Sequence, residues 1–222
     1  MDTLQLIKAR HSVRQYTEQK IEDETLEKLK AELRSAEEKS GLSFQLLLNE
    51  PGAFDCFLAR KLNFKNANNY IAITGKKTFE NEMNAGYFGT EIVLRAQEMG
   101  LNTCFVGGTF SRRKAKYKLQ SGEKLLCIIA IGYGETQGTQ HINCSIDKLC
   151  DFRGDMPPWF MKGMDYAMLA PTAMNDQKFC FILRNGNEVK LVPRGGHCKG
   201  VTLGIVKYHF EAGAGKENFV FV

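Results

Sequence analysis

The chain lacks the composition that marks a membrane, secreted or metal-binding protein. No window approaches the roughly 18 apolar residues of a membrane span, and the opening MDTLQLIKARHS has no apolar core of a signal peptide. The 7 cysteines form no CxxC pair, and an odd number in a reducing compartment indicates free thiols. We therefore expect a cytoplasmic protein without disulfides and without a metal site.

Motifs of common nucleotide-binding and hydrolytic enzymes are also missing. The chain contains no GxGxxG, no GxxxxGK[ST] and no GxSxG, which argues against a Rossmann site, a P-loop and an α/β-hydrolase nucleophile. The 4 histidines, His11, His141, His197 and His209, have no obvious nucleophile partner. No catalytic side chain is therefore assigned.

The composition is that of an ordinary globular protein. The 222 residues are 43% hydrophobic and 25% charged, and the net charge of +5 is too small for a typical nucleic-acid-binding surface. The positive charge is concentrated at Arg112, Arg113, Lys114, Lys116 and Lys118. This run is either a solvated surface or a binding module for nucleic acid or an acidic partner, and the first reading is favoured.

Hydrophobic periodicity predicts an α+β fold, because helices and strands are mixed without strict βαβ alternation. The non-alternating apolar runs 103–108 and 125–134 predict buried strands in the centre of a sheet. The chain divides into halves at 1–150 and 151–222. Helices are expected at 22–39, 79–99 and 201–210, and at 157–170, where Pro171 follows the helix end. A short helix is expected between the strands 43–49 and 69–75. Late strands are expected at 179–184, 188–192 and 218–222, the first two joined by an Asn-Gly turn.

The first candidate binding stretch is Arg10-His11-Ser12-Val13-Arg14. Two guanidinium groups with a hydroxyl between them can make forked, charge-assisted hydrogen bonds to a phosphate. Basic residues near helix ends are common, so the stretch is also compatible with plain surface.

The second stretch, 169–177, is rich in small residues and amides. Pro171, Thr172 and Ala173 admit a close ligand, while Asn175 and Gln177 carry donors and acceptors that can read the edge of a heterocycle. A capped turn explains the same residues equally well.

The third stretch runs from Gly100 to Gly108, where a buried strand ends in Val106, Gly107 and Gly108. Paired glycines let the backbone approach a flat ligand and expose N–H groups to it. A pair of glycines is weak evidence by itself.

Together the three stretches resemble the FMN-dependent nitroreductase family. RHSVRQY is similar to its Arg-x-Ser-x-Arg/Lys signature, APTAMNDQKF to its APSxxNxQPW motif, and MGLNTCFVGG with CIIAIGYG to its "GLGTC-x-x-G … GYP" half. The second motif follows the first by some 160 residues, which resembles a subgroup in which one chain is similar to two fused partial copies. The resemblance implies a nitroreductase-like fold, with a central mixed or antiparallel sheet flanked by helices, and an intrachain pseudo-dimer.

The resemblance also implies roles for individual residues. Arg10 and Ser12, within the same stretch as His11, would hold the FMN phosphate, and Arg14 would face the ribityl chain and the N1–O2 edge of the ring. The backbone of the strand end would lie against the ring, and the second stretch would face its dimethylbenzene side or the ribityl chain. The implied flavin-binding residues are Arg10, His11, Ser12, Arg14, Val106, Gly107, Gly108, Pro171, Thr172, Ala173, Asn175 and Gln177.

Two segments depart from the family pattern. The subgroup carries a Lys-rich stretch after the glycine-tyrosine strand, where this chain has His141-Ile142-Asn143-Cys144-Ser145. Lys178 and Phe179 replace the Pro and Trp of the wider family. One phosphate contact is therefore expected to be missing, and the packing above the ring to differ.

The resemblance implies an NAD(P)H-dependent, FMN-containing oxidoreductase that reduces a nitroaromatic, quinone or similar small acceptor by a ping-pong mechanism. The flavin performs the chemistry, which agrees with the lack of a catalytic side chain. The expected partner is thus a small molecule, with no nucleic acid and no membrane, and the chain is expected as a monomeric pseudo-dimer or a homodimer. The alternative is a non-catalytic flavin protein for storage or sensing.

Overall fold

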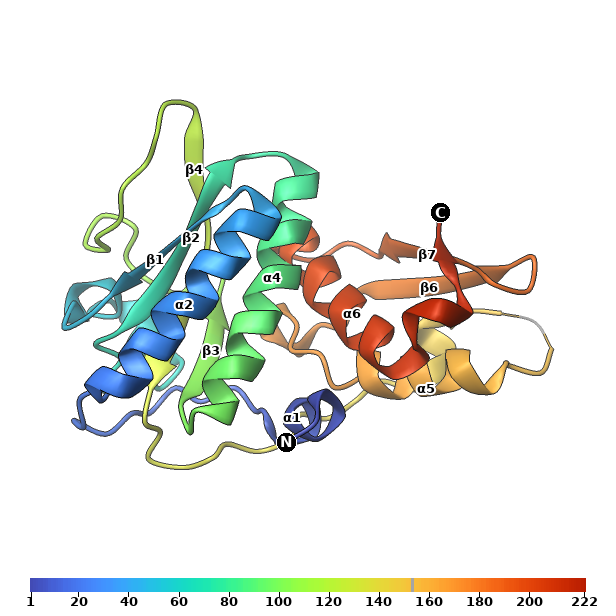
Figure 1. Cartoon of the computed structure of the whole chain (residues 1–222), viewed down its shortest axis with the longest axis horizontal. Coiled ribbons are helices and arrows are strands. Elements are labelled where there is room, and N and C mark those ends of the chain that lie inside the picture. Colours follow the sequence, from blue (N-terminus) through green and yellow to red (C-terminus); the bar gives the residue numbers. More distant parts are fainter. Residues whose placement is uncertain (153) are drawn as a thin grey trace.

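The first half of the chain forms an antiparallel sheet. The computed structural model describes residues 1–152 and 154–222. Its first sheet has the strand order β1-β2-β4-β3, with neighbouring strands antiparallel (Figure 1). The strands are β1 (Ser43–Leu47), β2 (Tyr70–Lys76), β3 (Asn102–Val106) and β4 (Glu123–Gly132).

Both faces of this sheet are covered, which explains why its strands do not alternate in polarity. The helices α2 (Asp23–Ser40) and α4 (Phe79–Glu98) pack on one face, over side chains such as Ile71 and Ile129. The opposite face, with Ile128, is covered by a second apolar cluster from the segments around η1 (Pro51–Ala53) and α3 (Phe57–Lys61).

The position of β3 differs from the prediction. β4 is an inner strand as expected, but β3 is the last strand of the sheet rather than a central one. The segment after the first helix, α1 (Thr3–Ala9), covers this edge, because Ser12 bridges to Thr103 and the Val13 N–H donates to the Thr103 carbonyl at 3.0 Å. A strand at a sheet edge is therefore as buried as a central one, and its composition does not distinguish the two.

The second half contains another four-stranded sheet, ordered β5-β6-β7-β8. β6 and β7 form the expected hairpin, and Asn185 and Gly186 in its turn both have positive φ. The outer pairs β5·β6 and β7·β8 are parallel. Its strands are β5 (Cys150–Asp151), β6 (Phe179–Arg184), β7 (Glu188–Pro193) and β8 (Val220–Phe221), and its helices are α5 (Pro158–Ala167) and α6 (Lys199–Ala214), with short 3-10 turns at Ile146–Lys148, Ala173–Asn175 and Lys216–Asn218.

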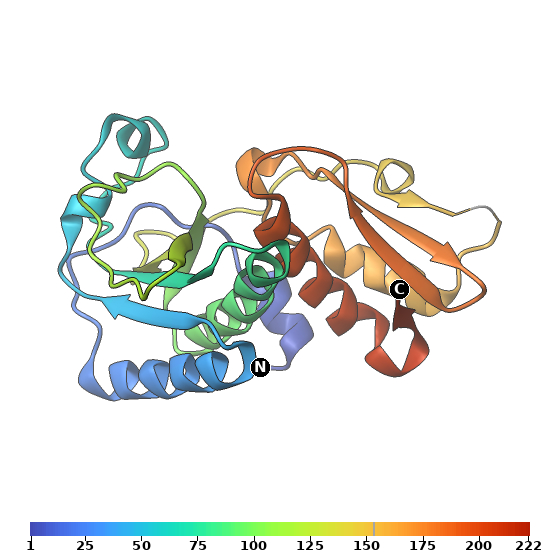
Figure 2. The same cartoon turned by 90° about the horizontal axis from the view of Figure 1, so that it is seen from above.

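Helices α4 and α6 join the two halves (Figure 2). They approach closely through glycine, since a Cβ added at Gly86 would collide with the Val201 carbonyl and one at Gly204 with the Met83 carbonyl. One hydrophobic cluster continues from Leu29 of α2 through Ile73 of β2 to Phe210 of α6. The α+β fold is thus confirmed, with its strands divided between two sheets that share a core.

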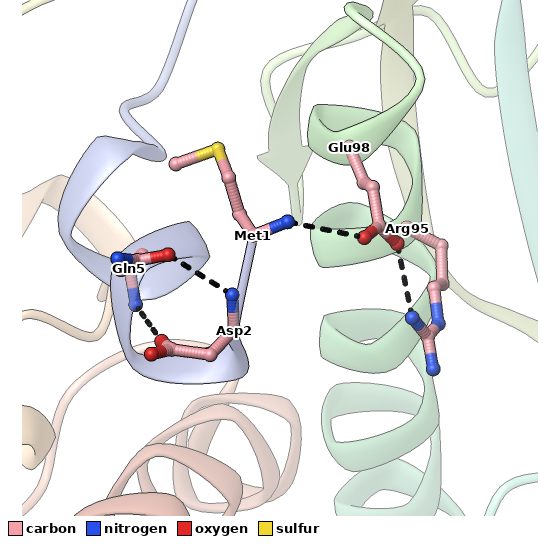
Figure 3. Close-up of polar contacts among 5 residues, drawn as sticks. All are labelled: Met1, Asp2, Gln5, Arg95 and Glu98. Atoms are coloured by element: carbon pink, nitrogen blue, oxygen red, sulfur yellow. Dashed lines mark hydrogen bonds and ion pairs between the residues drawn. The ribbon is translucent and has the colours of Figure 1, made fainter.

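The short helix α1 (Thr3–Ala9) lies across the ends of α4 and α6 (Figure 1). A capping box fixes its start, in which Asp2 accepts from the Gln5 N–H at 2.7 Å and Gln5 Oε1 accepts from the Asp2 N–H at 3.1 Å (Figure 3). The Met1 ammonium lies 3.6 Å from Glu98 of α4. The helix ends at Arg10, whose backbone N–H donates to the Leu6 carbonyl at 2.9 Å.

Among the described residues, no helix is long and apolar enough to cross a membrane.

Candidate functional site

The first candidate stretch lies along the outer edge of β3, as the bridge between Ser12 and Thr103 shows. Side chains on this edge alternate in exposure: Val13 is buried, whereas Ser12 is half-buried and Arg14 is exposed. The charge of Arg14 opposes the rise in the pKa of Cys104 that burial causes, which places the guanidinium near this strand. β3 is part of the third stretch and continues directly into Gly107 and Gly108. The bridge from Ser12 to β3 therefore brings the first and third stretches together.

Arg10 connects these two stretches to the second. It caps the C-terminus of α1, is only 4% exposed, and donates from Nη2 to the Leu169 carbonyl at 3.3 Å. Its Nε is buried without a partner, and no carboxylate pairs with it among the described residues. Burial lowers the pKa of Arg10 to about 10, so the side chain still carries its charge at neutral pH.

Three histidines surround this arginine. His141 Nε2 lies 2.9 Å from the Met168 carbonyl, and His209 Nδ1 lies 2.8 Å from the Ile205 carbonyl. Burial, followed by the charge of Arg10, lowers the pKa of His11 and lowers that of His209 to about 3. Burial also lowers the pKa of His141, and Arg10 adds to this effect. The cluster therefore holds one buried cation among imidazoles whose pKa values are lowered by burial and further lowered by its charge.

The second stretch is a loop whose amides are engaged within the chain. Gln177 accepts from the Cys144 N–H at 2.9 Å and donates to the Ile142 carbonyl at 2.8 Å. Asn175 donates to the same carbonyl at 2.9 Å. The amides predicted to read a ligand thus hold the segment 142–144 against the loop.

The backbone of this loop is strained. Met174, Asn175 and Gln177 all have positive φ, a region that non-glycine residues rarely adopt and that is concentrated at functional sites. Pro171, Thr172 and Ala173 are half-buried at its start. Phe179, at the family's Trp position, is a core residue packed edge-on against Phe181.

The glycine pair lies at the boundary between the halves. A Cβ at Gly107 would collide with the Cys198 sulfur at the start of α6, whereas one at Gly108 would meet nothing within 4 Å. Gly108 is exposed and Val106 is buried. The backbone at Gly108 is consequently open to a flat ligand.

The basic run begins four residues after Gly108, and the charge of Arg112 opposes the rise in the pKa of Cys198 that burial causes. Lys114 pairs with Asp55 at 2.6 Å, and Arg112 lies against the Phe110 ring with 5.5 Å to its centroid. Arg113 is exposed. A polar hollow of about 190 Å³ is lined by Tyr16, Thr17 and Asn68 among others, and contains none of the residues of the three stretches. Among the described residues no group of three or more His, Cys, Asp or Glu side chains could hold a metal ion.

Two residues near the site were not identified from the sequence. His209 stands in an apolar helix and Cys198 in a loop, and neither belongs to a recognised motif. Their places next to Arg10 and Gly107 depend on how α6 packs. His141, by contrast, stands in the segment where the family pattern is broken, which was a usable signal.

The family assignment follows from a match over nearly the whole chain. Residues 2–214 match the family model described as "Putative TM nitroreductase". No curated protein sequence matches the chain.

Solved structures with the same fold include a nitroreductase of Thermotoga maritima. It shares 21% sequence identity at a TM-score of 0.69, over 98% of this chain and 85% of that one. A Desulfovibrio desulfuricans nitroreductase in complex with FMN has a TM-score of 0.53 and 16% identity, over 71% of this chain and 99% of that one. A Parabacteroides distasonis protein described as "Putative NADH dehydrogenase/NAD(P)H nitroreductase" has a TM-score of 0.50 and 20% identity, over 68% of this chain and 98% of that one. Since these identities are low, the structures establish the fold, and the family model establishes that the chain belongs to the nitroreductase family.

Proposed function

We propose that the protein is an FMN-dependent oxidoreductase that takes hydride from NADH or NADPH and passes two electrons to a nitroaromatic, quinone or similar flat acceptor. Family membership supports an oxidoreductase, and the Desulfovibrio protein of the same fold binds FMN. The observation that carries the proposal is Arg10, a cation buried without a carboxylate where the three candidate stretches meet. Burying such a cation costs free energy unless an anion pairs with it, and a flavin phosphate is such an anion.

The residues present fit this cofactor. Arg10 is a buried cation that no carboxylate neutralises among the described residues, and the backbone at Gly108 is free of neighbours on the side where a Cβ would point. We assign Arg10, His11 and Ser12 to the phosphate, Arg14 to the ribityl chain and the N1–O2 edge, and Val106, Gly107 and Gly108 to the ring. Pro171, Thr172, Ala173 and Asn175 are assigned to the dimethylbenzene side or the ribityl chain, and Gln177 to shaping the loop that carries them.

When bound, FMN supplies the two-electron chemistry, so the protein needs no acid or nucleophile of its own. The task of Arg14 is to stabilise the negative charge that develops near N1–O2, as a fixed cation does without reorganisation. Arg14 is exposed and unpaired among the described residues, so its charge is available for this task.

We further propose that the chain is an intrachain pseudo-dimer, with the flavin held between halves at 1–150 and 151–222. The hydrogen bond from Arg10 to Leu169 supports this proposal, because it joins the Arg-rich segment to the loop that a second subunit supplies in the family at large. A monomer would then suffice for binding, and an additional homodimer is not required.

The test is a visible absorption spectrum of the purified full-length protein, recorded with added FMN and then with NADH or NADPH under anaerobic conditions. Flavin bands that remain with the protein and bleach with a nicotinamide are expected. Bound flavin that does not bleach would favour the alternative, a flavin storage or sensing protein. A protein that binds no FMN would overturn both.

A pair of variants sharpens this test. Arg14→Ala is expected to slow bleaching at least tenfold, the effect of losing about 1.4 kcal/mol of charge stabilisation. Arg113→Ala removes an equally exposed arginine from the basic run and should bleach like the unmodified protein. Equal rates for the two variants would contradict the role of Arg14.

A further inference from the structure

All buried side-chain polar atoms without a partner, among the described residues, belong to one neighbourhood. They are Arg10 Nε, Asn143 Oδ1 and His209 Nε2. Arg10 donates to the Leu169 carbonyl, His141 Nε2 lies 2.9 Å from the adjacent Met168 carbonyl, and the charges of Arg10 and His141 both act on the pKa of His209. Asn143 lies two residues beyond His141 in the chain. Each unsatisfied buried group costs about 1–3 kcal/mol, and native proteins keep few of them. Their concentration at Arg10 calls for a physical explanation.

The hydrogen bond of His209 determines which of its nitrogens carries the proton. Nδ1 lies 2.8 Å from the Ile205 carbonyl, which can only accept, so Nδ1 is the donor. The side chain is fully buried, and burial with the charge of Arg10 lowers its pKa to about 3. The imidazole is therefore neutral at physiological pH, and Nε2 presents a bare lone pair.

The three orphan atoms are chemically complementary. Arg10 Nε–H is a donor, whereas His209 Nε2 and Asn143 Oδ1 are acceptors. One water molecule can accept one hydrogen bond and donate two, which is the set of partners that these three atoms lack. An anion fits less well, because two of the three atoms are acceptors.

The surrounding elements hold these groups in place. Leu6 and Ile7, one turn before Arg10 on α1, pack with Tyr166 of α5 and with Tyr208, the residue before His209 on α6. The segment carrying Asn143 is tied down by Gln177 at 142 and 144. The acceptors are thus built on a rigid frame.

We propose that His209 is a positioning residue for Arg10, holding its Nε–H through a buried water shared with Asn143, so that the remaining N–H groups point at the phosphate of the flavin. The part concerning phosphate rests on the proposed function. The hydrogen bond of the Arg10 Nε–H does not depend on the cofactor, so it can be measured in the protein without FMN.

The first test uses nuclear magnetic resonance on the ¹⁵N-labelled full-length protein without FMN. Long-range ¹H–¹⁵N spectra should show His209 as the Nδ1–H tautomer, unchanged between about pH 5 and 9 despite the neighbouring Arg10, His11 and His141. The Arg10 Nε–H should exchange slowly with solvent. A His209 with its proton on Nε2, or a rapidly exchanging Arg10 Nε–H, would overturn the proposal.

The second test compares two substitutions of His209. Gln places an acceptor near the former Nε2, whereas Leu keeps apolar bulk without an acceptor. His209→Leu should speed exchange of the Arg10 Nε–H and raise the Kd for FMN about tenfold or more, the effect of losing a hydrogen bond to a charged group. His209→Gln should keep both properties within about threefold, which corresponds to less than 1 kcal/mol. Equal Kd values for Leu and Gln, both near that of the unmodified protein, would contradict the proposal.

A third variant tests the proposal without a substitution in the buried helix α6, where a replacement of His209 can disturb folding. Asn143→Ala removes the second acceptor from a half-buried loop and should also speed exchange of the Arg10 Nε–H. If the unmodified protein fails to bind FMN, the proposed function fails, while the exchange and tautomer measurements still decide whether His209 holds Arg10.

Discussion

Arg10 carries a positive charge into the interior with only a backbone carbonyl as its partner. The lowering of its pKa to about 10 from an ordinary 12.5 corresponds to a cost of about 3 kcal/mol for the charged form. Both pKa values lie above neutrality, so this cost is present in full at pH 7 and is relieved only as pH rises beyond 10. A residue that destabilises the free protein in this way is typical of a binding site.

Replacing Arg10 by Met should therefore separate stability from binding. Arg10→Met removes the buried charge and keeps most of the side-chain volume, so the free energy of unfolding without FMN is expected to stay equal or rise by up to about 3 kcal/mol. The Kd for FMN should increase about 10- to 100-fold, as expected for lost charge-assisted hydrogen bonds of about 1.5–3 kcal/mol. Urea unfolding and flavin fluorescence measure the two quantities. With Arg113→Met as the exposed control, unchanged FMN binding in the Arg10 variant would contradict the assignment.

The lowered pKa of His209 predicts how the free energy of unfolding depends on pH. Its pKa is about 3 in the folded protein and about 6.5 when unfolded, so the unfolded chain binds the proton first. Stability is then complete above about pH 6.5 and falls as pH decreases toward 3. Between pH 6.5 and 5 the free energy of unfolding should drop by about 2 kcal/mol from His209 alone, with smaller losses of the same sign from His11 and His141.

Urea unfolding at pH 7 and pH 5 measures this dependence. His209→Gln should lose about 2 kcal/mol of the difference between the two conditions. The matched control is His197→Gln, because His197 is exposed and its replacement should leave the difference as it is. A His209→Gln protein with the full acid dependence would show that another group is responsible.

At the scale of elements, the contact between α4 and α6 determines how the halves meet. Gly86 faces backbone atoms of α6. Gly89, one turn further along α4, faces the Phe105 ring, and a Cβ added at Gly89 would lie 3.0 Å from Cε1 of that ring. Backbone cannot move aside as a side chain can, so the two glycines differ in what they tolerate.

Alanine at these two glycines provides a matched comparison. Both substitutions raise helix propensity by the same amount, about 1 kcal/mol. Gly86→Ala should nevertheless destabilise the protein by at least about 2 kcal/mol, because the helices must separate. Gly89→Ala should cost clearly less, since the Phe105 ring can shift. Thermal unfolding measures both, and a Gly86→Ala protein as stable as Gly89→Ala would contradict the close helix contact.

At the scale of the molecule, the two sheets share one hydrophobic cluster, which runs from α2 to β8. Trp159, the only tryptophan, lies in the second half and stacks on Phe219 with ring centroids 5.7 Å apart. Its fluorescence therefore reports on one half, while circular dichroism reports on both.

The shared core predicts a single cooperative unfolding transition. Urea curves from Trp159 fluorescence and from far-ultraviolet circular dichroism should coincide in midpoint and slope. For the same reason a fragment of residues 1–150 should not fold stably, because it lacks the helix that covers α4. A tryptophan transition at clearly lower urea would show that the second half unfolds independently.

Patterns local in the sequence were sufficient for most of the helices and strands, although not for β5 or the full length of α6, and for singling out the candidate stretches. Apolar periodicity and glycine stops placed α2 and α4 within one or two residues, and the Asn185-Gly186 pair indicated the hairpin. The motif resemblance indicated the family, which the match over residues 2–214 confirms. These signals are readable because each depends on neighbours a few positions away.

Only the tertiary structure decided which distant groups meet. It placed β3 at the edge of a sheet under Ser12 and Val13, and divided the strands between two sheets. It also engaged the amides of Gln177 within the chain, and brought His209 of α6 to Arg10. The local elements and the available chemistry can be read from neighbouring residues, because backbone preference and side-chain type act locally. How that chemistry is assembled depends on the packing of α6 against α1 and α4, because burial and close contact involve residues far apart in the chain.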